Sequence, residues 1–174
     1  MQAAAAVGLL VWASACGEPK HRPEDEEVYN GPLVEAHDVL TLYSDSAKLK
    51  VKLKAPVQQE FENGDGVFPK GVDITFFEVE EQPTTTLRSN YGKFEKQKNT
   101  YVVTGNVVVK NLQKKETLNT EELHWDRTKQ EVFTDKFVRI ETPTEILTGQ
   151  GLRANQDFSR YRILKPTGIF TVKP

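Results

Sequence analysis

Residues 101–127 read YVVTGNVVVKNLQKKETLNTEELHWDR. This stretch decides the fold class, because its apolar residues recur at every second position and not at every third or fourth. A polar segment at 113–115 separates the valines of the first half from the leucine and tryptophan of the second half, and such a segment is typical of a tight turn. The stretch therefore predicts antiparallel strands joined by turns. It contains no cluster of catalytic side chains.

The rest of the chain repeats this pattern from residue 36 onward. Strict alternation of lysine with aliphatic residues spans 47–55, and further strands are predicted at 72–80, 131–142, 145–154, 159–165 and 168–173. Pro166 is interpreted as part of a turn between the last two of these. No segment shows a ten-residue helical face, so the sequence predicts an all-β sandwich, barrel or open roll of roughly ten strands.

Composition limits both the core and the partners. The 174 residues are 37% hydrophobic, which is below the usual share for a globular chain. The predicted core is therefore thin, and strands that alternate in this way give one continuous apolar face. The formal net charge is −2, so no overall basic field favours nucleic acid, and no nucleic-acid partner is expected.

The first sixteen residues, MQAAAAVGLLVWASAC, contain no charged side chain. Their apolar run is too short to span a membrane and has the length of a signal-peptide core. The small residues before Cys16 resemble a bacterial lipobox, although no Lys or Arg precedes the run and Ala13 stands where leucine is most common. The resemblance implies a diacylglycerol on Cys16; an uncleaved anchor or an incidental free cysteine are the alternatives.

The residues that follow Cys16 have the composition of a linker, with three prolines and an acidic run at 24–27. We therefore divide the chain into a signal and lipobox segment at 1–16, a flexible tether at 17–35 and a β domain at 36–174.

No constellation for catalysis or metal binding stands out. The three histidines, His21, His37 and His124, lie far apart, and the carboxylates at 121, 122, 126 and 157 do not single out an acid–base pair. The GQG at 149–151 lacks the helix that a phosphate loop needs, so a bulge or a close backbone approach is the better interpretation. We expect no enzyme activity, no cofactor and no metal site.

The basic stripe of Lys48, Lys50, Lys52 and Lys54 allows contact with nucleic acid or with anionic lipid. A solvated strand face that discourages edge aggregation is the favoured interpretation. A lipid headgroup contact stays open as the alternative.

Four stretches in order carry a family resemblance: GNVVV (105–109), LNTEELHWD (118–126), VFTDKFVRIET (132–142) and LTGQGLRANQDFSRYRI (147–163). Their succession resembles the organic-solvent-tolerance-like domain and is most similar to the LptC family, over about residues 36–173. The resemblance implies an open, V-shaped antiparallel β-jellyroll with an apolar interior. It also implies a protein that is not an enzyme. The lipid anchor suggested by Cys16 departs from the family pattern, because many members have a single membrane helix instead.

The function that the resemblance implies is transport of lipopolysaccharide. Such a protein sits on the periplasmic side of the inner membrane, takes lipopolysaccharide from an inner-membrane ABC transporter complex and passes it to a soluble periplasmic jellyroll protein. Docking on the latter is expected through the C-terminal edge, which comprises Gly168, Ile169, Phe170, Thr171 and Val172.

Alternation alone predicts which residues line the groove for the acyl chains. They are Ile74, Phe76, Val103, Val107, Val109, Leu123, Trp125, Val138, Ile140, Leu147, Leu152, Ile163 and Phe170. Trp125 has an alternative role as a core plug at the thick end of the roll. The parity of the alternation changes between Thr120 and Leu123, which predicts a bulge or bend there.

Three other functions compete with the conduit. A scaffolding lipoprotein would have the same roll with a closed core and no lipid cargo. An envelope enzyme would need two carboxylates facing each other across a cleft. The soluble partner module of the bridge would lack a membrane anchor.

Overall fold

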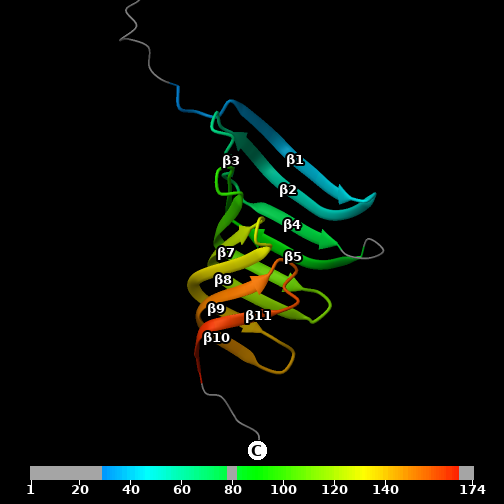
Figure 1. The fold of residues 1–174 in the computed structure, drawn as a ribbon, viewed down its shortest axis with the longest axis vertical. Helices are drawn as coiled ribbons and strands as arrows, with labels where there is room; N and C mark the ends of the chain where they lie inside the picture. Colours follow the sequence, from blue (N-terminus) through cyan, green and yellow to red (C-terminus); the bar gives the residue numbers. More distant parts are fainter. Residues whose placement is uncertain (1–28, 78–81, 169–174) are drawn as a thin grey trace, which may run out of the picture. The chain divides into compact units, whose positions relative to one another are not determined.

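The computed structural model describes residues 29–77 and 82–168 of the chain. Within them it contains eleven β-strands and no helix, which confirms the all-β prediction (Figure 1). The strands are β1 (Val34–Asp45), β2 (Lys48–Glu60), β3 (Gly66–Phe68), β4 (Val72–Phe77), β5 (Pro83–Ser89), β6 (Tyr91–Glu95), β7 (Thr100–Asn111), β8 (Glu116–Asp126), β9 (Glu131–Glu141), β10 (Ile146–Asn155) and β11 (Tyr161–Thr167).

All strands belong to one antiparallel sheet in the order β11-β10-β9-β8-β7-β5-β4-β2-β3-β6, with β1 paired to β2. Strands β7 to β11 are successive hairpins, as the short polar segments between them predict. The long strands β2 and β7 are joined through two separate pairs of shorter strands. Strands β4 and β5 connect them on one side, and β3 and β6 connect them on the other.

The long strands bend where their neighbours change. In β7 the bend falls at Gly105 and Asn106, whose φ values are 76° and 49°. The amide of Asn90 donates to the carbonyl of Gly105 at 2.9 Å, at the point where β5 gives way to β6. An extra residue in a strand bends it and increases its twist, so this bulge turns β7 out of one plane into another.

The neighbouring strands have irregularities at the same level. The register between β8 and β9 shifts between Thr120 and His124, which confirms the predicted bulge in that stretch. The register between β10 and β9 shifts between Gln150 and Leu152, around Gly151 with its φ of 79°. The interpretation of GQG as a bulge is therefore confirmed.

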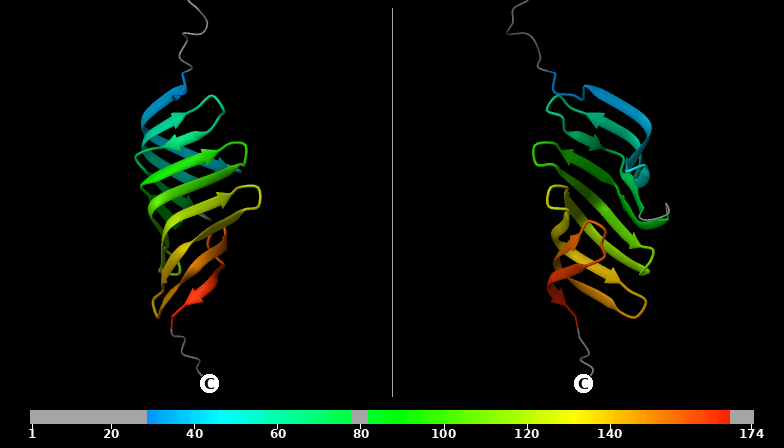
Figure 2. Two further views of the ribbon diagram at one scale, coloured as in Figure 1. Left: turned by 90° about the vertical axis from the view of Figure 1, so that its left-hand side faces the viewer. Right: turned by 45° about the vertical axis from the view of Figure 1, so that its right-hand side comes forward.

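These bends divide the sheet into two arms that share the long strands (Figure 2). We call arm A the part formed by β4, β5 and residues 107–111, 116–120, 138–141 and 146–150. Arm B is formed by β3, β6 and residues 100–104, 123–126, 131–134, 152–155 and 161–163. This arrangement is an open, V-shaped antiparallel jellyroll, as the resemblance implied.

The hydrophobic core lies between the inner faces of the arms. Val107 and Val138 are 0% exposed, and Leu152 is 1% exposed. The other buried members are Ala55, Phe68, Val72, Ile74, Leu87, Val103, Val109, Leu118, Leu123, Val132, Ile140, Ala154 and Phe158. Because these residues come from strands throughout the sheet, one apolar surface runs across both arms.

Two predictions about local structure were wrong. Pro166 does not form a turn, because it lies inside β11, where it faces Gly149 of β10. A proline that cannot donate to the ladder is tolerated there because β11 has its other edge free among the described strands. The lysine stripe is partly solvated, with Lys48 and Lys54 exposed, but it does not protect an edge, because β2 pairs with β1 on one side and with β4 and β3 on the other.

Candidate functional site

The structure brings the predicted lining residues together on the inner faces of the two arms. Phe76, Trp125, Leu147 and Ile163 are partly buried and pack against the core, and the others that the structure describes belong to the core itself. Phe170 and Cys16 lie outside the described residues. Of the predicted docking edge, the structure describes Gly168, which is exposed and has a φ of 133°.

The interior is packed at the centre. A cavity of about 30 Å³ lies between the arms, which is room for a few water molecules at most, since one water needs about 10–15 Å³ on this measure. It is lined by Ile74, Phe76 and Leu87 from arm A, by Tyr101, Val103, Leu123, His124, Trp125 and Val132 from arm B, and by Gln156 and Phe158. An acyl chain therefore needs residues of this interior to move before it can lie between the arms.

Aromatic rings cross the interior beside this cavity. The ring centre of Trp125 lies 5.4 Å from Tyr101 in a stacked arrangement and 6.3 Å from Phe76 in an edge-to-face arrangement. Tyr101 also packs against Phe94, its cross-strand neighbour, at 4.6 Å. Burial raises the pKa of Tyr101 above its ordinary value, so this phenol stays neutral.

The indole of Trp125 carries an unpaired polar group. Among the residues that the structure describes, its Nε1 is the buried side-chain nitrogen or oxygen that has no hydrogen-bond partner. A buried donor that loses its bond to water and gains none in return costs about 1–3 kcal/mol. This donor is therefore available to an acceptor that enters the interior.

The turn between β10 and β11 closes over the interior. Phe158 in this turn is 6% exposed and belongs to the core, although its φ is 55°. The Nζ of Lys114, in the turn after β7, donates to the carbonyl of Ser159 at 2.6 Å. We call residues 156–160 the strap, because they connect the end of arm B with arm A through Phe158 and Lys114.

The β1–β2 hairpin presents apolar side chains to solvent. Leu40 and Leu42 are 56% and 57% exposed, and they lie opposite Lys54 and Lys52 on the outer face. On the inner face Tyr43 pairs with Val51 and is 55% exposed. The hairpin therefore carries unburied apolar surface on both faces, in contrast to the packed centre.

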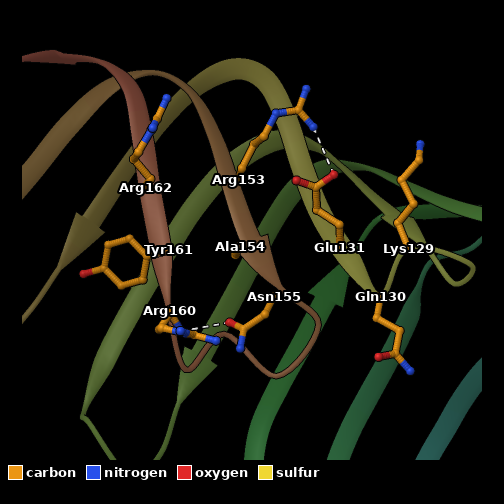
Figure 3. Close-up of a pocket in the computed structure, with 9 residues that line it drawn as sticks. All are labelled: Lys129, Gln130, Glu131, Arg153, Ala154, Asn155, Arg160, Tyr161 and Arg162. Atoms are coloured by element: carbon orange, nitrogen blue, oxygen red, sulfur yellow. Dashed lines mark hydrogen bonds and ion pairs between the residues drawn. The ribbon is translucent and has the colours of Figure 1, made fainter.

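A basic groove of about 530 Å³ lies outside the strap. It is lined by Lys129, Gln130, Glu131, Arg153, Ala154, Asn155, Arg160, Tyr161 and Arg162 (Figure 3). Arg153 and Arg162 extend in parallel from neighbouring strands, and Glu131 binds Arg153 at 3.1 Å. The strap contributes to both spaces, because Arg160 lines the groove while Phe158 lines the apolar cavity.

Asp126 fixes the turn that carries Lys129. Its Oδ1 accepts hydrogen bonds from the amides of Thr128 and Lys129, both at 3.0 Å, and its Oδ2 lies 2.9 Å from the Nζ of Lys129. The Lys129 amide and then its ammonium hold the pKa of Asp126 below its ordinary value. Asp126 is therefore ionised at neutral pH and partly neutralises this side of the groove.

The sequence of the chain matches the family described as lipopolysaccharide-assembly, LptC-related, over residues 2–167. The chain belongs to the LptC family. A comparison with curated proteins found no match.

Membership of the LptC family makes this chain a component of the lipopolysaccharide transport bridge and not an enzyme. The family is periplasmic and associated with the inner membrane. Within residues 29–77 and 82–168, no group of histidine, cysteine and acidic side chains could hold a metal ion. In that same part of the chain, no helix is long and apolar enough to cross a membrane.

Sequence reasoning missed several residues of this LptC-family interior. Leu87, Leu118 and Val132 have the strand alternation that identified their neighbours, so the signal was present for them. Phe158 had no such signal, because it lies in a polar turn and enters the core by a left-handed backbone conformation. The basic groove was also missed, because its residues come from two separate turns and three strands.

Proposed function

We propose that this protein is a membrane-anchored conduit for lipopolysaccharide. It accepts lipopolysaccharide from an inner-membrane ABC transporter complex and passes it to a soluble periplasmic jellyroll protein for export to the outer membrane. The observation that carries the proposal is the continuous apolar surface between the two arms, in a chain that belongs to a lipopolysaccharide-assembly family.

In this proposal the acyl chains occupy the space between the arms, on the predicted lining residues. Each CH₂ group that leaves water gains about 0.8 kcal/mol. Part of that gain is offset because Phe158 must leave the core. The binding that results is moderate, which suits a protein that has to release its cargo.

The indole of Trp125 gives the interior one point of polar recognition. Its Nε1 is a buried donor without a partner in the described part of the chain. A hydroxyl or carbonyl oxygen on an acyl chain would accept this hydrogen bond while the rest of the chain stays in apolar surroundings. The cavity beside Trp125 is lined mainly by aliphatic and aromatic side chains, which favours such a ligand over an isolated water.

Strand addition at the edges of the sheet would extend the apolar surface into neighbouring modules. The outer edge of β11 is free among the described strands, and the predicted docking residues 168–172 follow it directly. Main-chain hydrogen bonds at such an edge provide affinity without a deep pocket. The soluble jellyroll partner is assigned to this edge, and the transporter's own periplasmic domain is assigned to β1.

The proposal includes the anchor that the sequence predicts. Residues 1–16 act as a signal and lipobox segment with a lipid on Cys16, the residues from 17 to the start of β1 at Val34 act as a tether, and the strands that follow form the transport domain. The lipid would hold the protein on the periplasmic side of the inner membrane, close to the transporter. Mass spectrometry of the membrane-extracted protein tests this, since an intact Met1 without a diacylglyceryl group on Cys16 would contradict it.

A second candidate function is a scaffolding lipoprotein without lipid cargo. The packed interior favours it, because a cavity of about 30 Å³ holds no acyl chain without rearrangement. The two functions differ in whether the arms open in the cell.

Photo-crosslinking in living cells distinguishes the two functions. Probes at Phe76 and Ile163, which are partly buried on the inner faces, are expected to label lipopolysaccharide. Probes at Lys110 and Arg139, which lie on outer faces, serve as controls and are expected to label none. Equal labelling at all four positions would contradict the lining assignment, and unaltered surface lipopolysaccharide after depletion of the protein would favour the scaffold.

A further inference from the structure

The basic groove contains a cross-strand pair of arginines, and one of the two has no acidic partner among the described residues. Arg153 and Arg162 are direct cross-strand partners in β10 and β11. Like charges that face each other across an antiparallel pair destabilise the sheet. Glu131 neutralises Arg153 through an ion pair at 3.1 Å. No carboxylate in the described part of the chain lies within ion-pair distance of Arg162, so its charge stays uncompensated.

Arg153 is held in place before any ligand arrives. Besides its ion pair with Glu131, its guanidinium carbon lies 5.2 Å from the centre of the Phe133 ring. Phe133 is fixed in turn, because it stacks on His124 at 5.0 Å. A guanidinium restrained from two sides loses little conformational entropy when it binds, which favours affinity.

Two further cations lie at the rim of the groove. Lys129 comes from the turn after β8 and is paired with Asp126 at 2.9 Å. Arg160 comes from the strap, and no carboxylate of the described residues lies within ion-pair distance of its side chain (Figure 3). With four cations against Glu131 and Asp126, the groove has a local excess of positive charge in a chain whose formal net charge is −2.

We propose that this groove binds a phosphate group of the lipopolysaccharide headgroup, with Arg153 and Arg162 as its two principal ligands. The inference rests on the proposed function as a conduit. A guanidinium fork matches two phosphate oxygens, so two arginines that extend in parallel from neighbouring strands can together bind one phosphate monoester. A singly charged carboxylate would leave part of the arginine charge unmatched, and this favours the phosphate dianion.

The strap connects the headgroup site to the acyl site. Asn155 and Arg160 line the basic groove, while Gln156 and Phe158 line the apolar cavity. An amphiphile whose acyl chains replace Phe158 between the arms therefore has its headgroup next to Arg160. The two sites would together recognise a lipid that carries both long chains and a phosphate, and this distinguishes lipopolysaccharide from an uncharged lipid.

The experiment measures binding to the full-length protein in detergent, with EDTA present so that no divalent cation bridges phosphates. Wild type, Arg153→Gln and Arg162→Gln are compared for binding of phosphorylated lipopolysaccharide, enzymatically dephosphorylated lipopolysaccharide and free pyrophosphate. Arg139→Gln is the matched control, because Arg139 also lies on an outer strand face and is ion-paired to a glutamate, Glu141, at 2.8 Å.

The expected result for Arg162→Gln is a roughly tenfold loss of affinity for phosphorylated lipopolysaccharide and less than a twofold change for the dephosphorylated form. Arg139→Gln is expected to leave both affinities unchanged. Equal losses for both lipids, or a loss in Arg139→Gln as large as that in Arg162→Gln, would overturn the phosphate assignment.

The pyrophosphate measurement separates this inference from the proposed function. Pyrophosphate binding that is lost in Arg153→Gln and Arg162→Gln supports an anion site, whatever happens with the lipid. If wild type binds pyrophosphate in this way but binds neither form of lipopolysaccharide, the conduit and the headgroup source both fail. If wild type binds both forms of lipopolysaccharide equally well and binds no pyrophosphate, the conduit stands and the phosphate site fails.

Discussion

Replacing Phe158 with alanine separates the contribution of the strap to stability from its effect on lipid access. The ring is 6% exposed, so the substitution removes most of the free energy of burying a phenylalanine, which is about 1.5–3 kcal/mol. Because the ring lies in a turn that can relax, we expect a loss of about 2–3 kcal/mol, which is less than the largest losses in cores that cannot collapse around the cavity. A domain of this size has about 5–15 kcal/mol of stability and stays folded.

The same substitution should increase binding of apolar ligands. If the closed strap is favoured over an open one by about 2 kcal/mol, removing that preference raises the apparent affinity by up to about 30-fold. Urea unfolding gives the stability, and titration with an environment-sensitive apolar dye gives the affinity. Phe137→Ala is the control, because Phe137 is 53% exposed and its loss should change neither quantity by much.

A Phe158→Gly variant adds an internal check on the backbone of the strap. The φ of 55° is unfavourable for alanine but not for glycine, which offsets the greater flexibility of glycine in the unfolded chain. The two variants should therefore agree within about 1 kcal/mol in stability. If both lose stability as expected but bind the dye no better than wild type, Phe158 is an ordinary core residue and the strap does not control access.

Three further substitutions test the core, the edge and the groove. Leu152→Ala removes a side chain that is 1% exposed, and we expect it to lower the free energy of unfolding in urea by about 2–5 kcal/mol. Leu147→Ala, at a partly buried position, should lower it less. Similar losses for the two variants would contradict the core assignment. Gly149→Ala would place a Cβ 2.5 Å from the carbonyl oxygen of Lys165, so amide exchange in β11 should become faster, and unchanged exchange would refute this close approach. Asp126→Asn should destabilise the protein at pH 7. The pKa of Asp126 is lowered by folding, so its stabilisation is present above the unfolded pKa of about 3.9 and is lost as pH falls through the lower folded pKa. Melting temperatures of wild type and variant should therefore converge progressively as the pH falls below the unfolded pKa, and a constant difference would show that the carboxylate charge is not involved.

The alternation of side chains predicted most of the fold because it reports one local property, the face on which each residue lies. That property identified the strands of the second half and placed Val107, Val138 and Leu152 in the interior. It also predicted the bulge after Thr120, since a strand whose inward-facing residues change parity must contain an extra residue or a bend. The V-shape came from the family resemblance, because alternation does not say how far a sheet bends.

The features that alternation missed depend on contacts between distant segments. The strap closes over the interior because Lys114, in the turn after β7, meets Ser159, in the turn after β10. The basic groove forms because β11 aligns Arg162 with Arg153, and a shift of register by one residue would separate them. Such contacts follow from the order of strands in the sheet, which local patterns do not specify.

The packed interior and the transport function are compatible if the lipid-free and the lipid-bound protein bury the same apolar surface. An empty apolar groove between the arms would expose the inner valines and leucines to water, and it would promote association with other exposed edges. The Phe158 ring covers that surface when no lipid is bound. An acyl chain that displaces the ring exchanges one apolar contact for another. The net affinity is then the difference between two similar burial energies and stays small even for long chains. A conduit that works by such exchange needs a separate contact to select its cargo, and the charged groove outside the strap can provide one without strengthening the hold on the acyl chains.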